Sequence, residues 1–117
     1  MSPFERLEAW ARCHRLVLEV YAVTTTWPVH ERYGLTSQAR RAAVSAAADI
    51  AEGSAKRGRR EFRRYLDISL GSLAELEYLL RLASDLHYLA ESDYLRVRHC
   101  RQSAGRTTWR LYEAIRE

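Results

Sequence analysis

Six basic side chains gather within residues 56–64, and they are suited to binding an anion. They are Lys56, Arg57, Arg59, Arg60, Arg63 and Arg64. Only Glu61 opposes them, so six positive charges and one negative give this basic cluster +5, against +4 for the whole chain. Positive charge at the start of a helix opposes the helix dipole, which favours an anionic neighbour such as a phosphate backbone. A solvated face that keeps the protein soluble is an equally good interpretation.

A second group of charged residues could form a polar network. Its acidic members are Asp49, Glu52, Glu75 and Glu77, and its basic members are Arg40 and Arg41. Helix bundles that hold two metal ions use Glu-x-x-His pairs on facing helices, and this sequence has none. We therefore predict that the group serves structural or subunit contacts, with no metal.

The steps Cys13-His14 and His99-Cys100 suggest zinc, because thiolate and imidazole are preferred zinc ligands. Adjacent residues on a helix point about 100° apart, so one step does not aim both side chains at one metal. If the first and last helices are antiparallel, the two steps also miss each other by roughly 10 Å. We predict reduced, packed cysteines.

Catalytic signatures are missing from the sequence, which has no phosphate-binding glycine loop, HExxH, CxxC or GxSxG. We expect no catalytic residue, no cofactor and no enzymatic activity. The chain has 117 residues, of which 47% are hydrophobic and 29% charged, and this predicts one globular domain over residues 1–117. It lacks both an apolar run of about 18 residues and a secretory signal pattern, so we expect a cytoplasmic protein with no membrane partner.

An alanine-rich segment at residues 33–53 is the element around which the others should pack. Alanine has the highest helix propensity, but such a thin helix buries little apolar area unless bulkier helices enclose it. We expect a heavily contacted helix with Thr36 or Ser37 as its N-cap. It should end at Gly53 in the left-handed conformation.

Apolar residues at three- and four-residue spacing predict three more helices. The first runs from a capping box at Ser2 and Glu5 to about residue 26, the longest spans about 59–89, and the last begins after Ser92. Short connections between four helices predict an all-α, up-down-up-down four-helix bundle.

The longest helix is interrupted by small residues on its apolar seam. Gly71 and Ser72 should let the alanine-rich helix approach closely, since a mid-helix glycine costs about 1 kcal/mol relative to alanine. Beside this seam, Glu75 and Glu77 either pair with the arginines at 40 and 41 or are solvated.

Four segments of the chain resemble a known family. They are FERLEAW (4–10), the Trp27-Pro28 step, ERYGLTSQARRAAVSAAADIAEGSAKR (31–57) and EFRRYLDISLGSLAELEYLL (61–80). They are similar to bacterial proteins encoded within intervening sequences of 23S ribosomal RNA genes, some of which are labelled S23-like ribosomal proteins. The resemblance implies a left-handed four-helix bundle that assembles into a ring, as a homopentamer. It also implies a relation to accessory proteins of diversity-generating retroelements, which bind a reverse transcriptase and nucleic acid.

One residue departs from the family pattern. Asp49 stands where the family more often has Asn, and a carboxylate there predicts a more ionic network.

Our leading hypothesis is a non-enzymatic, oligomeric protein that binds nucleic acid, specifically RNA, through the basic cluster. We expect it to read backbone and shape, because no aromatic platform interleaves these arginines. Replacing Arg59, Arg60, Arg63 and Arg64 by Ala should then abolish binding without unfolding the bundle. The alternative is an interaction scaffold for a protein such as a reverse transcriptase.

Overall fold

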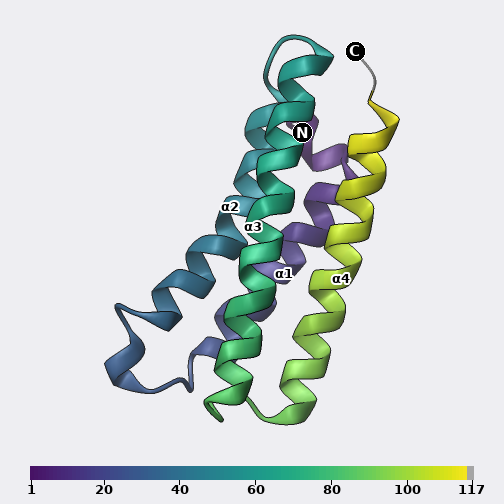
Figure 1. Ribbon diagram of the computed structural model, residues 1–117. Coiled ribbons are helices and arrows are strands. Elements are labelled where there is room, and N and C mark those ends of the chain that lie inside the picture. The colour runs from purple at the N-terminus through teal and green to yellow at the C-terminus, as the bar shows by residue number, and fades with distance from the viewer. Residues whose placement is uncertain (116–117) are drawn as a thin grey trace.

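The computed structural model describes residues 1–115 and is all-α in that range (Figure 1). Its α-helices are α1 (Glu8–Thr24), α2 (Leu35–Ser54), α3 (Arg59–Asp85) and α4 (Glu91–Ala114), and its short 3-10 helices are η1 (Pro3–Arg6) and η2 (Val29–Glu31). The predicted all-α class with four main helices is confirmed. None of the described helices is both long enough and apolar enough to span a bilayer.

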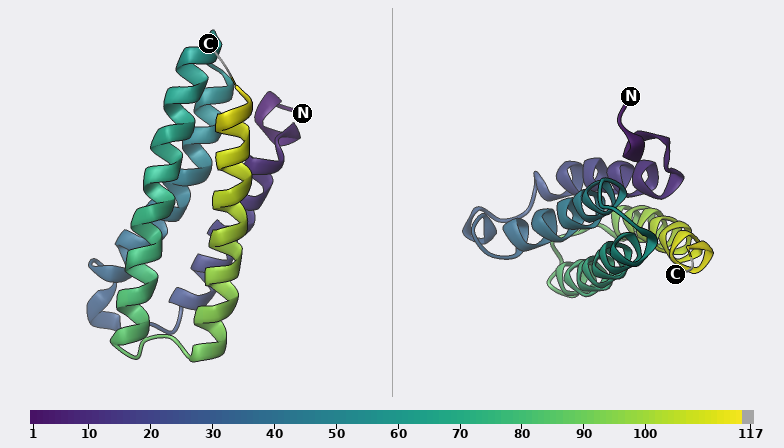
Figure 2. Two further views of the ribbon diagram at one scale, coloured as in Figure 1. Left: turned by 45° about the vertical axis from the view of Figure 1, so that its right-hand side comes forward. Right: turned by 90° about the horizontal axis from the view of Figure 1, so that it is seen from above.

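Each α-helix packs against two others: α1 and α3 both contact α2 and α4 (Figure 2). Residues later in α1 contact residues earlier in α4. Cys13 Sγ lies 3.7 Å from Thr108 Oγ1, whereas Glu19, further along α1, pairs with Arg96, earlier in α4, at 3.2 Å. These two helices therefore run in opposite directions along a molecule of 44 × 24 × 23 Å.

The alanine-rich helix α2 is heavily contacted, as its sequence predicts. Five of its alanines are buried, at positions 39, 42, 43, 46 and 47, together with Ile50. Its most extensive contact is with α3, where the buried Ser69 hydroxyl donates a 2.7 Å hydrogen bond to the Ala46 carbonyl. Small side chains on one helix thus let a bulkier helix approach its backbone.

The two glycines singled out by sequence have different roles from those predicted. Gly53 is not a left-handed terminator, because α2 continues to Ser54. A Cβ at Gly53 would lie 2.6 Å from Tyr65 Cβ, so the glycine permits the close approach of α3. Gly71 is exposed and a Cβ there would meet nothing within 4 Å. The close contact expected at Gly71 and Ser72 is therefore made at Ser69 and Gly53.

Helix boundaries also differ from the prediction at the start of the chain. The capping box of Ser2 and Glu5 is present, but it closes the 3-10 turn η1. Leu7 is then extended, with φ −86° and ψ 124°, so α1 begins only at Glu8.

Helix α2 begins at Leu35 with Gly34 as its N-cap, two residues before the predicted cap Thr36 and three before Ser37. The Glu31 carboxylate accepts a 3.0 Å hydrogen bond from the Leu35 amide and a 3.0 Å bond from the Tyr88 hydroxyl. These two hydrogen bonds, the amide bond first, lower the pKa of Glu31. A side chain from the preceding turn therefore supplies the acceptor that Thr36 or Ser37 was expected to provide.

Helix α3 ends at Asp85, four residues before its predicted end. His87 adopts a left-handed φ of 65°, and the Tyr88 amide bonds the Ala83 carbonyl at 2.9 Å. This geometry is a Schellman-type helix end, which usually places glycine at the left-handed position. Helix α4 then starts at Glu91 with Ala90, not Ser92, as N-cap.

Candidate nucleic-acid interface

The basic cluster lies at the connection between α2 and α3, at the same end of the bundle as the C-terminal end of α4 (Figure 1). Gly58, with φ 85°, turns the chain into α3. Arg57, Arg59 and Arg60 are exposed, and within residues 1–115 they form no hydrogen bond or ion pair through their side chains. These three guanidinium groups are available to an external anion.

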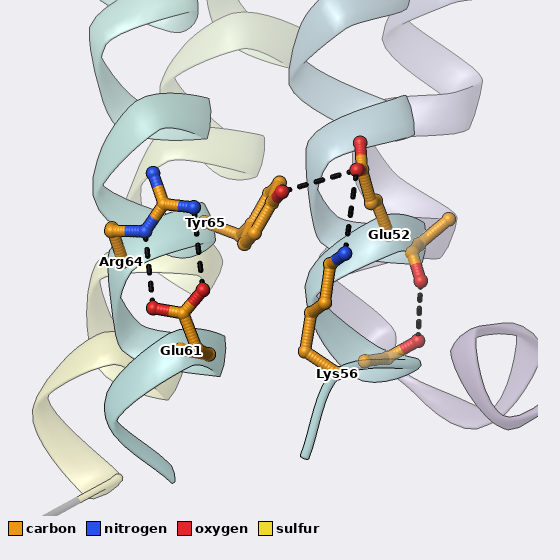
Figure 3. Close-up of polar contacts among 7 residues, drawn as sticks. Glu52, Lys56, Glu61, Arg64 and Tyr65 are labelled. Atoms are coloured by element: carbon orange, nitrogen blue, oxygen red, sulfur yellow. Dashed lines mark hydrogen bonds and ion pairs between the residues drawn. The ribbon is translucent and has the colours of Figure 1, made fainter. Parts of the chain in front are cut away.

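Lys56 and Glu52 meet at the end of α2 (Figure 3). Lys56 Nζ lies 4.0 Å from Glu52 Oε2, and the Tyr65 hydroxyl donates a 3.1 Å hydrogen bond to the same carboxylate oxygen. Lys56 also lies 5.5 Å from the Tyr65 ring centroid. The predicted network residue Glu52 therefore partly neutralises the predicted binding residue Lys56.

Arg64 is paired within α3 (Figure 3). Its Nε and Nη2 donate hydrogen bonds of 3.2 and 3.3 Å to the Glu61 carboxylate. The hydrogen bond from Arg64 is the main cause that lowers the pKa of Glu61. Since the pair is exposed, it contributes little to stability, and an approaching phosphate can compete with Glu61 for the guanidinium.

Arg63 differs from the other members of the basic cluster because it faces α4. Its Nε donates a 3.1 Å hydrogen bond to the Tyr112 carbonyl, and its guanidinium carbon lies 4.0 Å from the Tyr112 ring centroid. Its Nη2 is 3.8 Å from Glu113, and the side chain is 24% exposed. Arg63 therefore satisfies one of the last carbonyls of α4 and joins this helix to α3.

A surface hollow of about 530 Å³ lies beside these residues. It is lined by Arg60, Glu61, Arg63, Arg64, Asp67 and Tyr112. The Tyr112 ring stacks on Trp109 with centroids 5.5 Å apart and planes 24° apart, and Trp109 is 51% exposed. The expectation of no aromatic surface near the arginines is thus wrong. The sequence did contain an indication of this aromatic surface. Trp109 and Tyr112 are spaced i, i+3 beside the apolar stripe of their helix, so their rings lie on the same side of it.

Of the two alternatives that the sequence left open for Glu75 and Glu77, pairing with Arg40 or Arg41 is not found among the described residues. Arg40 donates a 2.9 Å hydrogen bond to Thr24 Oγ1, and Glu77 lies 3.8 Å from Arg101. Arg41 and Glu75 are exposed. In the described part of the chain no ion pair joins Arg40 or Arg41 to Glu75 or Glu77.

Asp49 is half-buried and forms no ion pair within residues 1–115. Burial, and then the nearby Glu52 charge, raise the pKa of Asp49. The more ionic network expected around this carboxylate does not form within the described chain.

Both cysteines are free thiols. Burial raises the pKa of Cys13 to about 11, partly opposed by its hydrogen bond with Thr108. Burial also raises the pKa of the half-buried Cys100. In residues 1–115 no group of three or more His, Cys, Asp or Glu side chains is arranged to hold a metal ion.

Comparisons with known proteins identify relatives of this fold. The family model described as 23S rRNA-intervening sequence protein matches residues 5–108. A crystal structure of a protein of unknown function from the S23 ribosomal protein family of Bacteroides thetaiotaomicron aligns with a TM-score of 0.82 and 17% sequence identity, covering 90% of this chain and 95% of that one. At this identity the likeness concerns the fold alone. No curated protein matches the chain.

Proposed function

We propose that this chain, which belongs to the family of 23S rRNA-intervening sequence proteins, is a non-enzymatic protein that binds RNA through its basic cluster. The observation that carries the proposal is the set of three exposed arginines, at positions 57, 59 and 60, whose side chains form no hydrogen bond or ion pair within residues 1–115. Lys56 and Arg64 flank them in exposed ion pairs that a phosphate can replace. Arg63 contributes indirectly, by holding α4 against the start of α3.

The physical basis is charge neutralisation of the RNA backbone. A guanidinium binds phosphate through two parallel hydrogen bonds, and each phosphate contact releases counterions, so affinity falls steeply as salt rises. Because such contacts carry no sequence information, the cluster fixes where the backbone lies without selecting a sequence.

We further propose that the chain forms a left-handed, up-down-up-down bundle and assembles in the cytoplasm into a ring of identical subunits, as a homopentamer. Large apolar side chains remain exposed on α1, α2 and α3, namely Leu18, Tyr21, Val44, Ile68 and Tyr78. Arg41 and Glu75 are exposed near them in the sequence and suit charged contacts between copies. A ring would repeat the basic cluster and increase avidity. Light scattering that gives a monomer mass at working concentrations would contradict this assembly.

The RNA-binding proposal is tested with two matched triple variants. Arg57→Ala/Arg59→Ala/Arg60→Ala removes these three arginines of the cluster. The control removes the same charge elsewhere, from the exposed residues Arg15, Arg32 and Arg98. We expect the first variant to lose most of its affinity for a single-stranded RNA in an anisotropy titration, and the control to lose little. Equal losses would mean that net charge alone, and no particular surface, attracts RNA.

A scaffold for a protein partner, such as a reverse transcriptase, is the second candidate function. It is favoured by a hollow of about 420 Å³ between the N-terminal part of α2 and the end of α1, lined in part by Tyr21, Tyr33 and Arg40. Tyr33 is 90% exposed there. Copurification with a reverse transcriptase encoded beside the gene, abolished by Tyr33→Ala and unaffected by the cluster variant, would favour this function over RNA binding.

A further inference from the structure

The aromatic pair on α4 is unusual because one of its rings is open to solvent. Tyr112 is covered on one face by the Arg63 guanidinium, 4.0 Å from its centroid, and stacks with Trp109 at 5.5 Å. Trp109, the other member of this aromatic pair, is 51% exposed. Arg63, Tyr112 and Trp109 therefore form a connected group, and the indole of Trp109 is its exposed aromatic member.

Packing of the core does not account for this exposure. The buried residues of α4 are Val97, Ala104 and Thr108, and Trp109 lies about 100° around the helix from Thr108. By contrast, Trp27 is 5% exposed and belongs to the core. A large exposed aromatic side chain next to a charged surface is typical of a binding site.

The connected group of Arg63, Tyr112 and Trp109 adjoins the basic cluster. Arg63 belongs to both, and Tyr112 forms part of the wall of the 530 Å³ hollow that Arg60 and Arg64 also line. Arg106, one turn before Trp109 on α4, is exposed as well. A flat apolar ring therefore lies beside several cations, which is the combination that proteins use to bind single-stranded nucleic acid.

We propose that Trp109 stacks on an unpaired base of single-stranded RNA whose backbone follows the basic cluster. This inference rests on the proposed RNA-binding function and specifies its substrate as single-stranded. In a duplex the faces of the bases are covered by their neighbours, whereas an unpaired base presents a π face to an aromatic side chain. Trp109 and Tyr112 lie outside residues 5–108, the segment that the family model matches. The inference therefore rests on side chains of this chain and not on the family pattern.

The experiment compares Trp109→Ala and Trp109→Phe with the unmodified protein, using three probes: a single-stranded oligouridylate, an RNA duplex of equal length, and inorganic polyphosphate, which has no bases. We expect Trp109→Ala to weaken oligouridylate binding roughly 5- to 150-fold, the range for loss of one stacked base, with polyphosphate and duplex binding unchanged. Trp109→Phe should restore much of the affinity. Leu95→Ala, which removes another exposed apolar side chain of α4, should have no effect.

Several results would overturn the inference. Unchanged oligouridylate binding in Trp109→Ala would exclude stacking, and equal losses for all three probes would indicate a general electrostatic or folding effect. A changed mass in light scattering would assign Trp109 to a contact between subunits. Failure of the proposed RNA-binding function itself gives a different result. In that case the Arg57/Arg59/Arg60 triple variant would bind polyphosphate and oligouridylate with the same affinity as the unmodified protein.

Discussion

Replacing Arg63 by Ala should destabilise the protein, although sequence alone groups Arg63 with surface arginines. The change removes a hydrogen bond from a charged donor to the Tyr112 carbonyl, worth roughly 1.5–3 kcal/mol. It also removes a guanidinium–ring contact at 4.0 Å, worth about 0.5–1 kcal/mol. The 3.8 Å ion pair with Glu113 is partly exposed and adds little. Because these contributions overlap, we expect a net loss of about 2–3 kcal/mol.

The assay is thermal and urea unfolding followed by circular dichroism at one fixed protein concentration, since assembly would make the midpoint concentration-dependent. For a chain of this size the loss corresponds to a fall in Tm of roughly 8–12 °C. Arg60→Ala is the matched control and should change stability by less than about 0.5 kcal/mol. Equal Tm values for Arg63→Ala and Arg60→Ala would refute the structural role of Arg63. That result would also support the prediction that Arg59, Arg60, Arg63 and Arg64 can all be replaced by Ala without unfolding the bundle.

Three further changes test individual features of the fold. Gly53→Ala places a Cβ 2.6 Å from Tyr65 Cβ and should destabilise by roughly 1–2 kcal/mol in urea unfolding, because overpacking outweighs the gain in helix propensity; a gain in stability would contradict the close approach. His87→Gly relieves the left-handed φ of 65° and should raise stability by about 0.5–1 kcal/mol, whereas a lower Tm would contradict this. Glu31, whose pKa is lowered in the folded state, stabilises the protein above its unfolded pKa and loses this effect as pH falls through the folded value. Glu31→Gln should therefore show a weaker loss of stability below about pH 4.5, and identical pH profiles would refute the capping role.

The alanine-rich helix was predictable because its pattern is local. Its composition implies a helix, and its small side chains imply enclosure, as found at alanines 39, 42, 43, 46 and 47. The roles of the glycines were not predictable in the same way. A glycine near a helix end serves either a left-handed turn or a close contact, and the choice depends on the facing residue, here Tyr65 opposite Gly53. Such a pairing arises only when α2 and α3 are packed together.

In the candidate interface, too, local sequence features were predictable and contacts between helices were not. The basic cluster is contiguous in sequence, so its position at the start of a helix could be predicted. The partner of Arg63 lies 49 residues away on α4, and no local pattern indicates it. Trp109 and Tyr112 were visible as aromatic residues beside the apolar stripe, but their place next to the arginines requires the packing of α4 against the start of α3.

The central claim, that the exposed arginines at positions 57, 59 and 60 contact RNA phosphates, is tested most directly by the salt dependence of binding. Kd for a single-stranded RNA is measured over a series of salt concentrations for the unmodified protein and for the Arg57→Ala/Arg59→Ala/Arg60→Ala variant. Losing three phosphate contacts should make the slope of log K against log salt shallower by about 2. An unchanged slope, with affinity retained, would contradict the claim.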